Sequence, residues 1–264
     1  MRSSDRTDAY FERIGVTAFR PTGHTGGGWD PTELHFGPVS GLMVHAIEQH
    51  VGASRPGMLA SRISFDIFGR LATDDCEIAV ETIRPGRTIE LVEATMRIRD
   101  RVVATARAWF LAAGDTSAVA GGAAPPMTPP EALPAWDLTE VWPGGFVRSL
   151  RVRGERRRPG RATAWLSTDV RLVAGETSSP LASFVALIDP ANGIAFREPG
   201  EKWVFPNVDL TLHFHRQPAG QPVGLDISVV FGPTGQGVTT TLLHDSLGHV
   251  GYAEQIITVR PAGS

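Results

Sequence analysis

The sequence is poor in features that mark several large classes of protein. Its 264 residues include one cysteine, Cys76, which excludes an internal disulfide and favours a reducing compartment such as the cytoplasm. No apolar run approaches the roughly 20 residues of a membrane-spanning helix, and no apolar stretch follows the charged N-terminus as in a signal peptide. We therefore expect a cytoplasmic protein with no membrane partner, in which Cys76 is a small core residue.

Several functional motifs are missing as well. The chain has no Gly-x-Ser-x-Gly elbow, which argues against a serine hydrolase of the α/β type, and no glycine loop of the kind that cradles phosphate. The net charge is -3, so no overall field attracts nucleic acid, and we expect no nucleic-acid partner. His213 and His215 share one face of a predicted strand, but no third ligand accompanies them, so no metal or other cofactor is expected.

What the sequence does contain is an internal repeat. Residues 61–112 and 209–259 follow one plan of alternating apolar runs and turns, at an offset of roughly 147 residues. A short segment of helical period precedes each copy, and the two stripes consist of Val39, Leu42, Met43, Ala46 and Ile47, and of Leu181, Phe184, Val185 and Ile188. We interpret the chain as one fold used twice, and we expect a functional site where the copies differ.

The alternating runs predict the strands of each copy. In the first copy, strands are expected over residues 11–18, 61–71, 76–83, 89–98 and 102–111, with a β-bulge near residues 91–94, where the apolar phase slips. In the second copy, strands are expected over residues 147–152, 161–173, 208–214, 223–231, 238–243 and 249–259, with a helix over residues 180–188. Such a half buries one helix in the concave face of a curled antiparallel sheet.

Two such halves can join edge to edge, which hides strands that would otherwise be exposed. The predicted fold class is therefore α+β, a double hotdog in which two helix-plus-antiparallel-sheet halves are fused in one chain. The N-terminal hotdog is assigned to residues 1–112 and the C-terminal hotdog to residues 146–264. Residues 113–145 contain Gly-Gly and Pro-Pro pairs and are predicted to form an extended linker, pinned to the body by Trp136 and Trp142.

Two stretches resemble the acyl-CoA thioesterase II family. They are V-E-T-I-R-P-G-R-T at residues 80–88 and N-V-D-L-T-L-H-F-H-R at residues 207–216, together with Gln255. The resemblance implies hydrolysis of acyl-CoA thioesters by a water that an Asp, a Thr and a Gln hold against the thioester carbonyl. In this chain the Asp position falls on Asp189 and the Gln position on Gln255, whereas the Thr position falls on Asn207.

The two copies differ at the positions that the resemblance singles out. Gln255 corresponds to Ala108 of the first copy and Asp189 to Glu48, so we expect a single active site in the C-terminal half. Simpler interpretations stay open: Asp189 can close its helix in an Asp-Pro turn, Gln255 can face solvent, and Asn207 can be a turn residue. Glu48 is a rival base, with an exposed helix charge as its own alternative.

Four further residues, Gly37, Glu48, Arg156 and Arg157, are predicted to contact the substrate. Gly37 opens the first helix, where a backbone N–H can polarise the thioester carbonyl. Arg156 and Arg157 belong to an arginine-rich run that suits the phosphates of coenzyme A, or else forms a solvated hairpin. His35 and His45 are interpreted as ordinary loop and helix residues.

The sequence thus predicts an acyl-CoA thioesterase whose partner is a small-molecule acyl-CoA. The exposed sheet edges favour a homodimer or a higher homo-oligomer. The alternative is a non-catalytic acyl-CoA or fatty-acyl binding protein of the hotdog fold. Hydratases of this fold carry a His five residues after an Asp, whereas Ile194 holds that place after Asp189, which argues against hydration.

Overall fold

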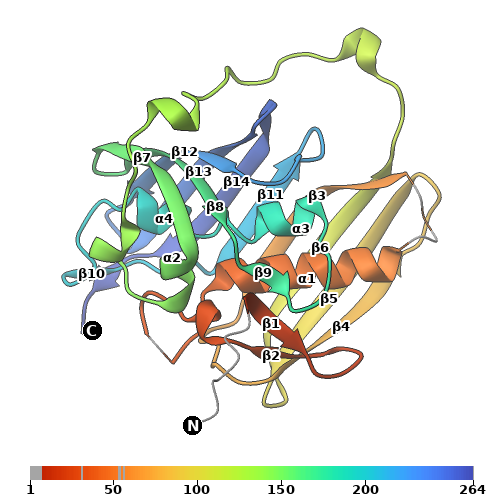
Figure 1. Cartoon of the computed structure of the whole chain (residues 1–264), viewed down its shortest axis with the longest axis horizontal. Coiled ribbons are helices and arrows are strands. Elements are labelled where there is room, and N and C mark those ends of the chain that lie inside the picture. Colours follow the sequence, from red (N-terminus) through yellow and green to blue (C-terminus); the bar gives the residue numbers. More distant parts are fainter. Residues whose placement is uncertain (1–7, 31, 53–54, 56, 264) are drawn as a thin grey trace.

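A single 13-stranded sheet carries both halves of the chain in the computed structural model, which describes residues 8–30, 32–52, 55 and 57–263 (Figure 1). The strand order is β7-β8-β12-β13-β14-β11-β3-β6-β5-β4-β2-β1-β9, and β10 pairs with β15 in a separate two-stranded sheet. The N-terminal elements are β1 (Ala9–Arg13), β2 (Ala18–Pro21), α1 (Phe36–Val51), β3 (Met58–Ile67), β4 (Cys76–Arg84), β5 (Ile89–Ile98) and β6 (Arg101–Ala112).

The C-terminal elements are α2 (Gly145–Ser149), β7 (Leu150–Arg158), β8 (Arg161–Thr168), β9 (Arg171–Val173), α3 (Pro180–Val185), α4 (Ala191–Ile194), β10 (Trp203–Val204), β11 (Asp209–Phe214), β12 (Val223–Phe231), β13 (Gln236–Asp245), β14 (Gly248–Thr258) and β15 (Arg260–Pro261). Short 3-10 turns are η1 (Gly23–Thr25), η2 (Ser117–Val119), η3 (Pro130–Ala132) and η4 (Leu138–Glu140).

The two halves meet where β11 pairs antiparallel with β3, with Leu210 opposite Phe65 and Leu212 opposite Ile63. Outward from this junction, β14-β13-β12-β8 on one side correspond to β6-β5-β4-β2 on the other. The pairing satisfies the backbone groups of one edge of each half. The predicted double hotdog, of class α+β, is confirmed.

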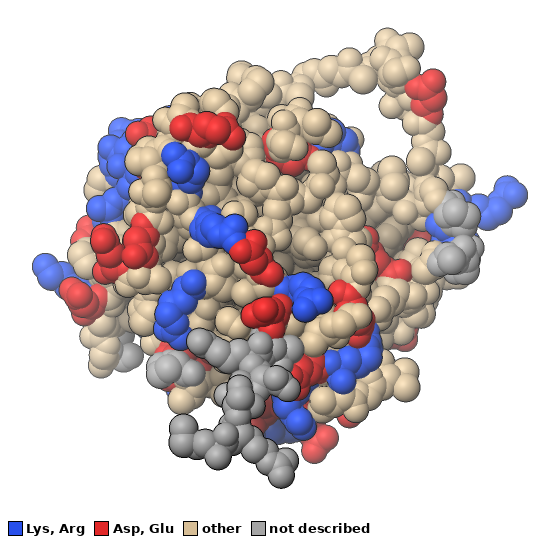
Figure 2. Space-filling model, viewed as in Figure 1, with Lys and Arg blue, Asp and Glu red and all other residues tan. Residues whose placement is uncertain are grey.

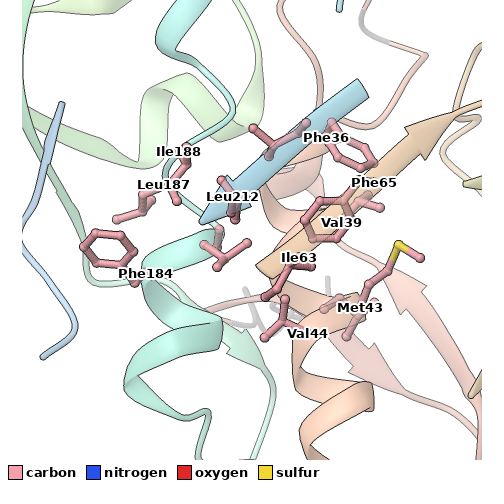
Figure 3. Packing of buried hydrophobic residues seen from close by; sticks show 14 of the residues in the cluster. Phe36, Val39, Met43, Val44, Ile63, Phe65, Phe184, Leu187, Ile188 and Leu212 are labelled. Carbon is pink, nitrogen blue, oxygen red and sulfur yellow. The ribbon is translucent and has the colours of Figure 1, made fainter. Parts of the chain in front are cut away.

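Two helices, α1 and α3, lie in front of the sheet (Figure 1) and pack against each other. Figure 3 shows Phe36 of α1 beside Phe65 of β3, and their rings meet edge to face with centroids 5.6 Å apart. The helices touch at Gly41, where an added Cβ would lie 2.6 Å from the Cβ of Ala186. A glycine is therefore needed for the two backbones to approach this closely.

The second helix is shorter than predicted. The predicted helix over residues 180–188 ends too late: α3 stops at Val185, and tighter turns lead to α4 at Ala191. Pro190 has no N–H and disfavours helical backbone at the residue before it, which is Asp189. The consequence is that Asp189 lies in the turn between α3 and α4 rather than on a continuous helix.

Two details of the first half also differ from prediction. The apolar phase of β5 does not slip, since Ile89 is 41% exposed whereas Glu90 is 3% exposed. The Glu90 carboxylate lies 3.4 Å from the guanidinium of Arg55, so an opposite charge accompanies this group on the buried face. The register shift lies instead in the neighbouring strand β4, between Thr82 and Arg84.

Several strand bounds are corrected. Residues 11–18 belong to a hairpin of β1 and β2, β3 ends at Ile67, and β7 begins at Leu150 because the short helix α2 precedes it. The run 161–173 is broken into β8 and β9, and β9 pairs in parallel with β1, with Ala9 opposite Arg171. Because β1 belongs to the N-terminal half and β9 to the C-terminal half, this pairing ties the two halves together a second time.

Residues 113–145 contain no strand and arch away from the body before they return to it (Figure 1). The Trp142 indole N–H donates to the carbonyl of Gly193 over 2.8 Å, as its predicted pinning role requires. Trp136 is partly buried against the core, and its backbone N–H donates to the carbonyl of Val152. A third contact, from the Trp165 indole to the carbonyl of Thr128, holds the middle of the segment.

The core and the surface match the composition. Cys76 is 1% exposed, and burial raises the pKa of its thiol to about 12, as a core residue requires. Figure 2 shows acidic and basic side chains intermixed over the face in view. Among the residues that the structure describes, no helix has the length and apolar character needed to cross a membrane.

Candidate active site

Three predicted residues converge on one point of the C-terminal half. Asp189 lies between α3 and α4, Asn207 lies just before β11, and Gln255 lies in β14. The Asn207 side-chain amide donates to Asp189 Oδ1 over 2.9 Å. The Gln255 side-chain amide donates to the Asp189 backbone carbonyl over 3.1 Å and approaches Oδ1 at 3.3 Å. Residues that are far apart in sequence thus form one polar cluster.

Local structure explains how each side chain reaches this point. Gln255 is on the buried face of β14, opposite Thr239 of β13, and is 2% exposed. Asn207 forms an isolated bridge with Ile257 of β14, so the strand that carries Gln255 also places Asn207. The Asn207 amide donates a second hydrogen bond to the carbonyl of Asp209 over 3.1 Å, which fixes its rotation. Because Gln255 is buried, the alternative in which it faces solvent is wrong.

The Asp189 carboxylate contacts two side-chain amides and a histidine, and among the described residues it has no lysine or arginine partner. Its side chain is 6% exposed, and Oδ1 accepts the two amide hydrogen bonds. Its other oxygen lies 3.1 Å from His35 Nδ1. A buried carboxylate needs such donors, since its desolvation is otherwise costly.

Gln255 contributes an acceptor as well as a donor. Its side-chain oxygen is buried and accepts no hydrogen bond from the described residues. An acceptor in this state carries an unmet desolvation cost that a small polar donor would relieve. The cluster therefore contains, close to the Asp189 carboxylate, a buried acceptor that has no partner among the described residues.

His35 joins the cluster although sequence reasoning treats it as an ordinary loop residue. It is the N-cap of α1, and its Nδ1 accepts from the Gly37 N–H over 3.1 Å. Its ring packs on Phe146 with centroids 4.3 Å apart. The only sequence signal was a polar residue directly before a helix start, and nothing in the sequence placed that start beside Asp189.

Gly37 brings the beginning of α1 against this part of the second half. An added Cβ at Gly37 would lie 2.7 Å from the carbonyl oxygen of Ala186 and 2.9 Å from the ring of Phe146. Only glycine allows this approach. The helix N-terminus, with N–H groups that have no partner inside the helix, therefore faces the turn that carries Asp189.

A cleft of about 120 Å³ opens beside the cluster. Its polar lining comes from Glu33, His35, Asp189, Asn192 and Asn207, and its other lining residues are Gly27, Gly28, Trp29, Leu34, Phe36, Ile67, Gly69, Leu71 and Pro206. A smaller apolar hollow adjoins it and shares Trp29, His35 and Asn192 with it. The cleft thus combines polar groups with apolar walls, as sites for small molecules do.

Glu48 is not part of this cluster. It lies 13 residues after His35, which is roughly 20 Å along a helix. Its carboxylate accepts a hydrogen bond from the Ser179 hydroxyl, and burial raises its pKa above the usual range. The structure therefore does not bring Glu48 together with Asn207 and Gln255, and it would act only at a separate site.

The two arginines predicted for substrate phosphates lie on the β7–β8 hairpin. The Arg156 guanidinium stacks on Phe196 at 4.0 Å from the ring centroid, while Arg157 pairs with Glu155 at 3.3 Å. Phe196 meets Trp142 edge to face, and Trp142 lines the apolar hollow beside the cleft. Arg156 is thus linked to the cleft by aromatic rings, whereas Arg157 lies in a surface ion pair.

The histidines of β11 and of the residue after it, His213 and His215, do not belong to the Asp189 cluster. His215 contacts His249 at 3.1 Å, and burial lowers the pKa of His249 below its usual range. In the described ranges, no group of three His, Cys, Asp or Glu side chains has the arrangement of a metal site. His213 of β11 is exposed and lies opposite Tyr252 of β14.

A double hotdog chain whose C-terminal half carries a buried polar cluster is the class that the fold and the site define. Residues 25–111 match the family model of the acyl-CoA thioesterase N-terminal domain, and residues 122–259 match that of the C-terminal domain. The chain belongs to the acyl-CoA thioesterase family. The resemblance stated from the sequence and the enzyme class, a thioester hydrolase, are confirmed.

Solved structures share this fold at low sequence identity. The acyl-CoA thioesterase II TesB2 from Mycobacterium marinum superimposes with a TM-score of 0.69 at 17% identity, over 97% of this chain and 97% of that chain. A protein of unknown function with a hot dog fold from Alicyclobacillus acidocaldarius gives 0.74 at 16% identity, over 97% of both chains. The tesB protein of Mycobacterium avium subsp. paratuberculosis gives 0.70 at 17% identity, over 95% and 96%. No curated protein sequence matches the chain.

Proposed function

We propose that the protein hydrolyses acyl-CoA thioesters to the free acid and coenzyme A with a water molecule held by Asp189, Asn207 and Gln255. The observation that carries this proposal is that two side-chain amides, of Asn207 and Gln255, converge on the Asp189 carboxylate beside a cleft. Membership of the acyl-CoA thioesterase family supports the reaction class.

The reaction follows from the donors and acceptors of the cluster. The Gln255 oxygen and the Asp189 carboxylate orient the water, whose oxygen attacks the thioester carbonyl carbon while its proton passes to Asp189. A carboxylate has about four lone-pair positions, so the three groups around Asp189 leave one for this water. The C–S bond then breaks, and coenzyme A leaves as a thiolate that takes up a proton.

The negative charge on the carbonyl oxygen needs a donor. The Gly37 N–H lies at the start of α1, beside the turn that carries Asp189. Backbone N–H groups at a helix N-terminus are fixed dipoles that stabilise such an oxyanion. Arg156, which stacks on Phe196 next to the Trp142 ring of the adjoining hollow, is our candidate for contact with the phosphates of coenzyme A.

A second candidate function is binding of acyl-CoA or a fatty acyl group without chemistry. It is favoured by the state of Asp189, both of whose oxygens already have partners in the cluster. Asn207 also holds the carboxylate with an amide, where the resemblance implies a hydroxyl. A group held in this way can shape a polar pocket as well as it can accept a proton.

The two functions are separated by incubating the protein with acyl-CoAs of several chain lengths and following free thiol. We expect release of coenzyme A by the wild type and a fall in kcat of about 10³-fold or more in Asp189→Asn, because the proton acceptor is lost. The control is Asp100→Asn, an exposed position with φ of 62°, which asparagine tolerates. Thioester binding without thiol release by the wild type would establish the binding function instead.

A further inference from the structure

Three histidines of the C-terminal half lie together where the linker, residues 113–145, meets the sheet. His215 follows β11, His244 belongs to β13 and His249 belongs to β14. The His249 ring stacks on His215 with centroids 5.0 Å apart and meets the His244 ring edge to face at 5.2 Å. His244 is 1% exposed and His249 is 5% exposed, so these two rings are withdrawn from water.

The linker forms hydrogen bonds with both of the buried rings. The Ala124 backbone N–H donates to His249 Nδ1 over 3.4 Å, and His244 Nε2 lies 3.2 Å from the carbonyl oxygen of Pro125. A backbone N–H can only donate, and a carbonyl oxygen can only accept. It follows that His249 has no proton on Nδ1 and that His244 carries a proton on Nε2.

The third ring uses the same nitrogen of His249. His215 Nε2 lies 3.1 Å from His249 Nδ1, and because this nitrogen is an acceptor, His215 donates to it. Neutral His249 carries its own proton on Nε2, a buried atom with no partner among the described residues. His249 Nδ1 thus accepts from one donor on the linker and from one on the body of the protein.

A second proton on His249 does not fit this arrangement. It would occupy Nδ1 and point at the N–H groups of Ala124 and His215, so that donors would face donors. The exposed His215 ring can move its own proton to Nδ1 and accept from His249 instead. The Ala124 N–H cannot become an acceptor, so protonation of His249 breaks its hydrogen bond with the linker.

The carboxylate beside the cluster is already occupied. Asp245 lies at the end of β13, and its side chain is 0% exposed. Its oxygens accept from the Arg216 guanidinium at 2.6 and 2.7 Å, and from the backbone N–H groups of Ala219 and Leu247 at 2.8 Å. A carboxylate has about four lone-pair sites, so Asp245 has none left for a protonated His249.

The other groups that face His249 are basic or neutral. The Arg216 guanidinium donates to the His249 backbone carbonyl over 3.1 Å, and the Tyr252 ring meets His249 edge to face at 4.8 Å. Residues 119–130 of the linker carry no titratable side chain. Burial lowers the pKa of His249 below its usual range, and the neighbouring basic side chains act in the same direction.

We propose that His249 is a pH-sensitive anchor of the linker, in which the neutral ring holds the segment at Ala124 and the protonated ring releases it. A histidine that is free of the cluster titrates with a pKa of about 6.5. In the docked state the pKa of His249 is lower, so docked His249 binds fewer protons than released His249. The anchor is therefore at full strength above about pH 6.5 and weakens as the pH falls below that value.

Backbone amide NMR of the full chain tests this without substrate, because the protection of the Ala124 amide against hydrogen exchange reports the contact. In the wild type we expect this protection, corrected for the intrinsic exchange rate, to fall by about tenfold between about pH 7.5 and about pH 5.5. In His249→Gln the side-chain oxygen can accept from Ala124 but does not titrate, so protection should not depend on pH. In His249→Phe the acceptor is lost, and protection should be low at every pH.

The matched control is His213→Gln, which makes the same change at an exposed position of β11 and should keep the pH dependence of the wild type. His244→Gln should keep it too, because a glutamine amide can donate to the Pro125 carbonyl. Wild-type protection that does not change with pH would overturn the proposal. So would a change in His249→Gln as large as in the wild type, or a loss of pH dependence in His244→Gln, which would make His244 the titrating group.

Discussion

The two halves of the chain place different groups at equivalent points of one fold. Glu48, late in α1, accepts a hydrogen bond from Ser179, the residue that caps α3. Asp189, just after α3, contacts His35, the residue that caps α1. Each acidic side chain therefore meets the beginning of the other half's helix. The arrangement is reciprocal, so the difference between the halves must lie in the residues around each acid.

The sheet supplies that difference. The equivalence of the strands follows from their register, in which the matching cross-strand pairs are Ser64–Arg107 and Thr211–Glu254. One residue further along, Gln255 brings an amide to Asp189, whereas Ala108 offers a methyl group that is fully buried. When only one half of a duplicated fold carries the polar cluster, the other half can place apolar atoms at the equivalent position. Apolar atoms need no hydrogen-bond partner when they are buried.

The largest effect is expected when the residue of the second half is replaced by its equivalent from the first half. In Gln255→Ala the amide to Asp189 and the open acceptor are both lost, so we expect kcat for acyl-CoA hydrolysis to fall by about 10²-fold. Steady-state thiol release measures this, with Gln236→Ala, at an exposed position, as the control. Unchanged kcat in Gln255→Ala would mean that the asymmetry of the sheets has no part in the reaction.

The reverse change tests whether the first half tolerates a polar group. Ala108 is 0% exposed, so Ala108→Gln buries an amide that has no prepared partner. We expect the free energy of unfolding to fall by about 1–3 kcal/mol, measured by urea denaturation, with kcat within about twofold of the wild type. Ala108→Ser, which introduces a smaller polar group, should lower the free energy of unfolding by less. A stable Ala108→Gln variant with raised activity would contradict the assignment of a single site to the second half.

The smallest effect is expected at Glu48. Burial raises the pKa of Glu48, so the charged form destabilises the folded state, and this penalty disappears as the pH falls through the raised pKa. Glu48→Gln should therefore raise the thermal midpoint by about 1–2 °C near pH 7.5, with a difference that closes toward about pH 4.

The same Glu48→Gln variant should keep kcat within about twofold. A dead Glu48→Gln enzyme alongside an active Asp189→Asn enzyme would move the site to the first half. The matched stability control is Glu131→Gln, which makes the same change at an exposed position.

Much of the fold was predictable because it depends on short-range patterns. Alternation marks the strands that flank the junction, and the stripe that begins at Val39 marks α1. One prediction went wrong where a partner distant in sequence decides the outcome. Glu90 is buried beside Arg55, a residue from another part of the chain. The other error had a local cause, because Pro190 disfavours helical backbone at Asp189 and the helix predicted over residues 180–188 ends early. The predicted domain limits and the homo-oligomer remain predictions.

The sequence by itself determined that this chain is a duplicated hotdog and that Asp189, Asn207 and Gln255 are its polar outliers, because periodicity and resemblance are properties of the chain alone. Only the tertiary structure decided that Asn207 and Gln255 both donate to the Asp189 carboxylate, and that His35, from the other half, lies beside its second oxygen. The physical reason is that α1 and α3 pack closely at Gly41 across the joined sheet. That contact sets where each helix begins relative to the other half, and no local pattern encodes it.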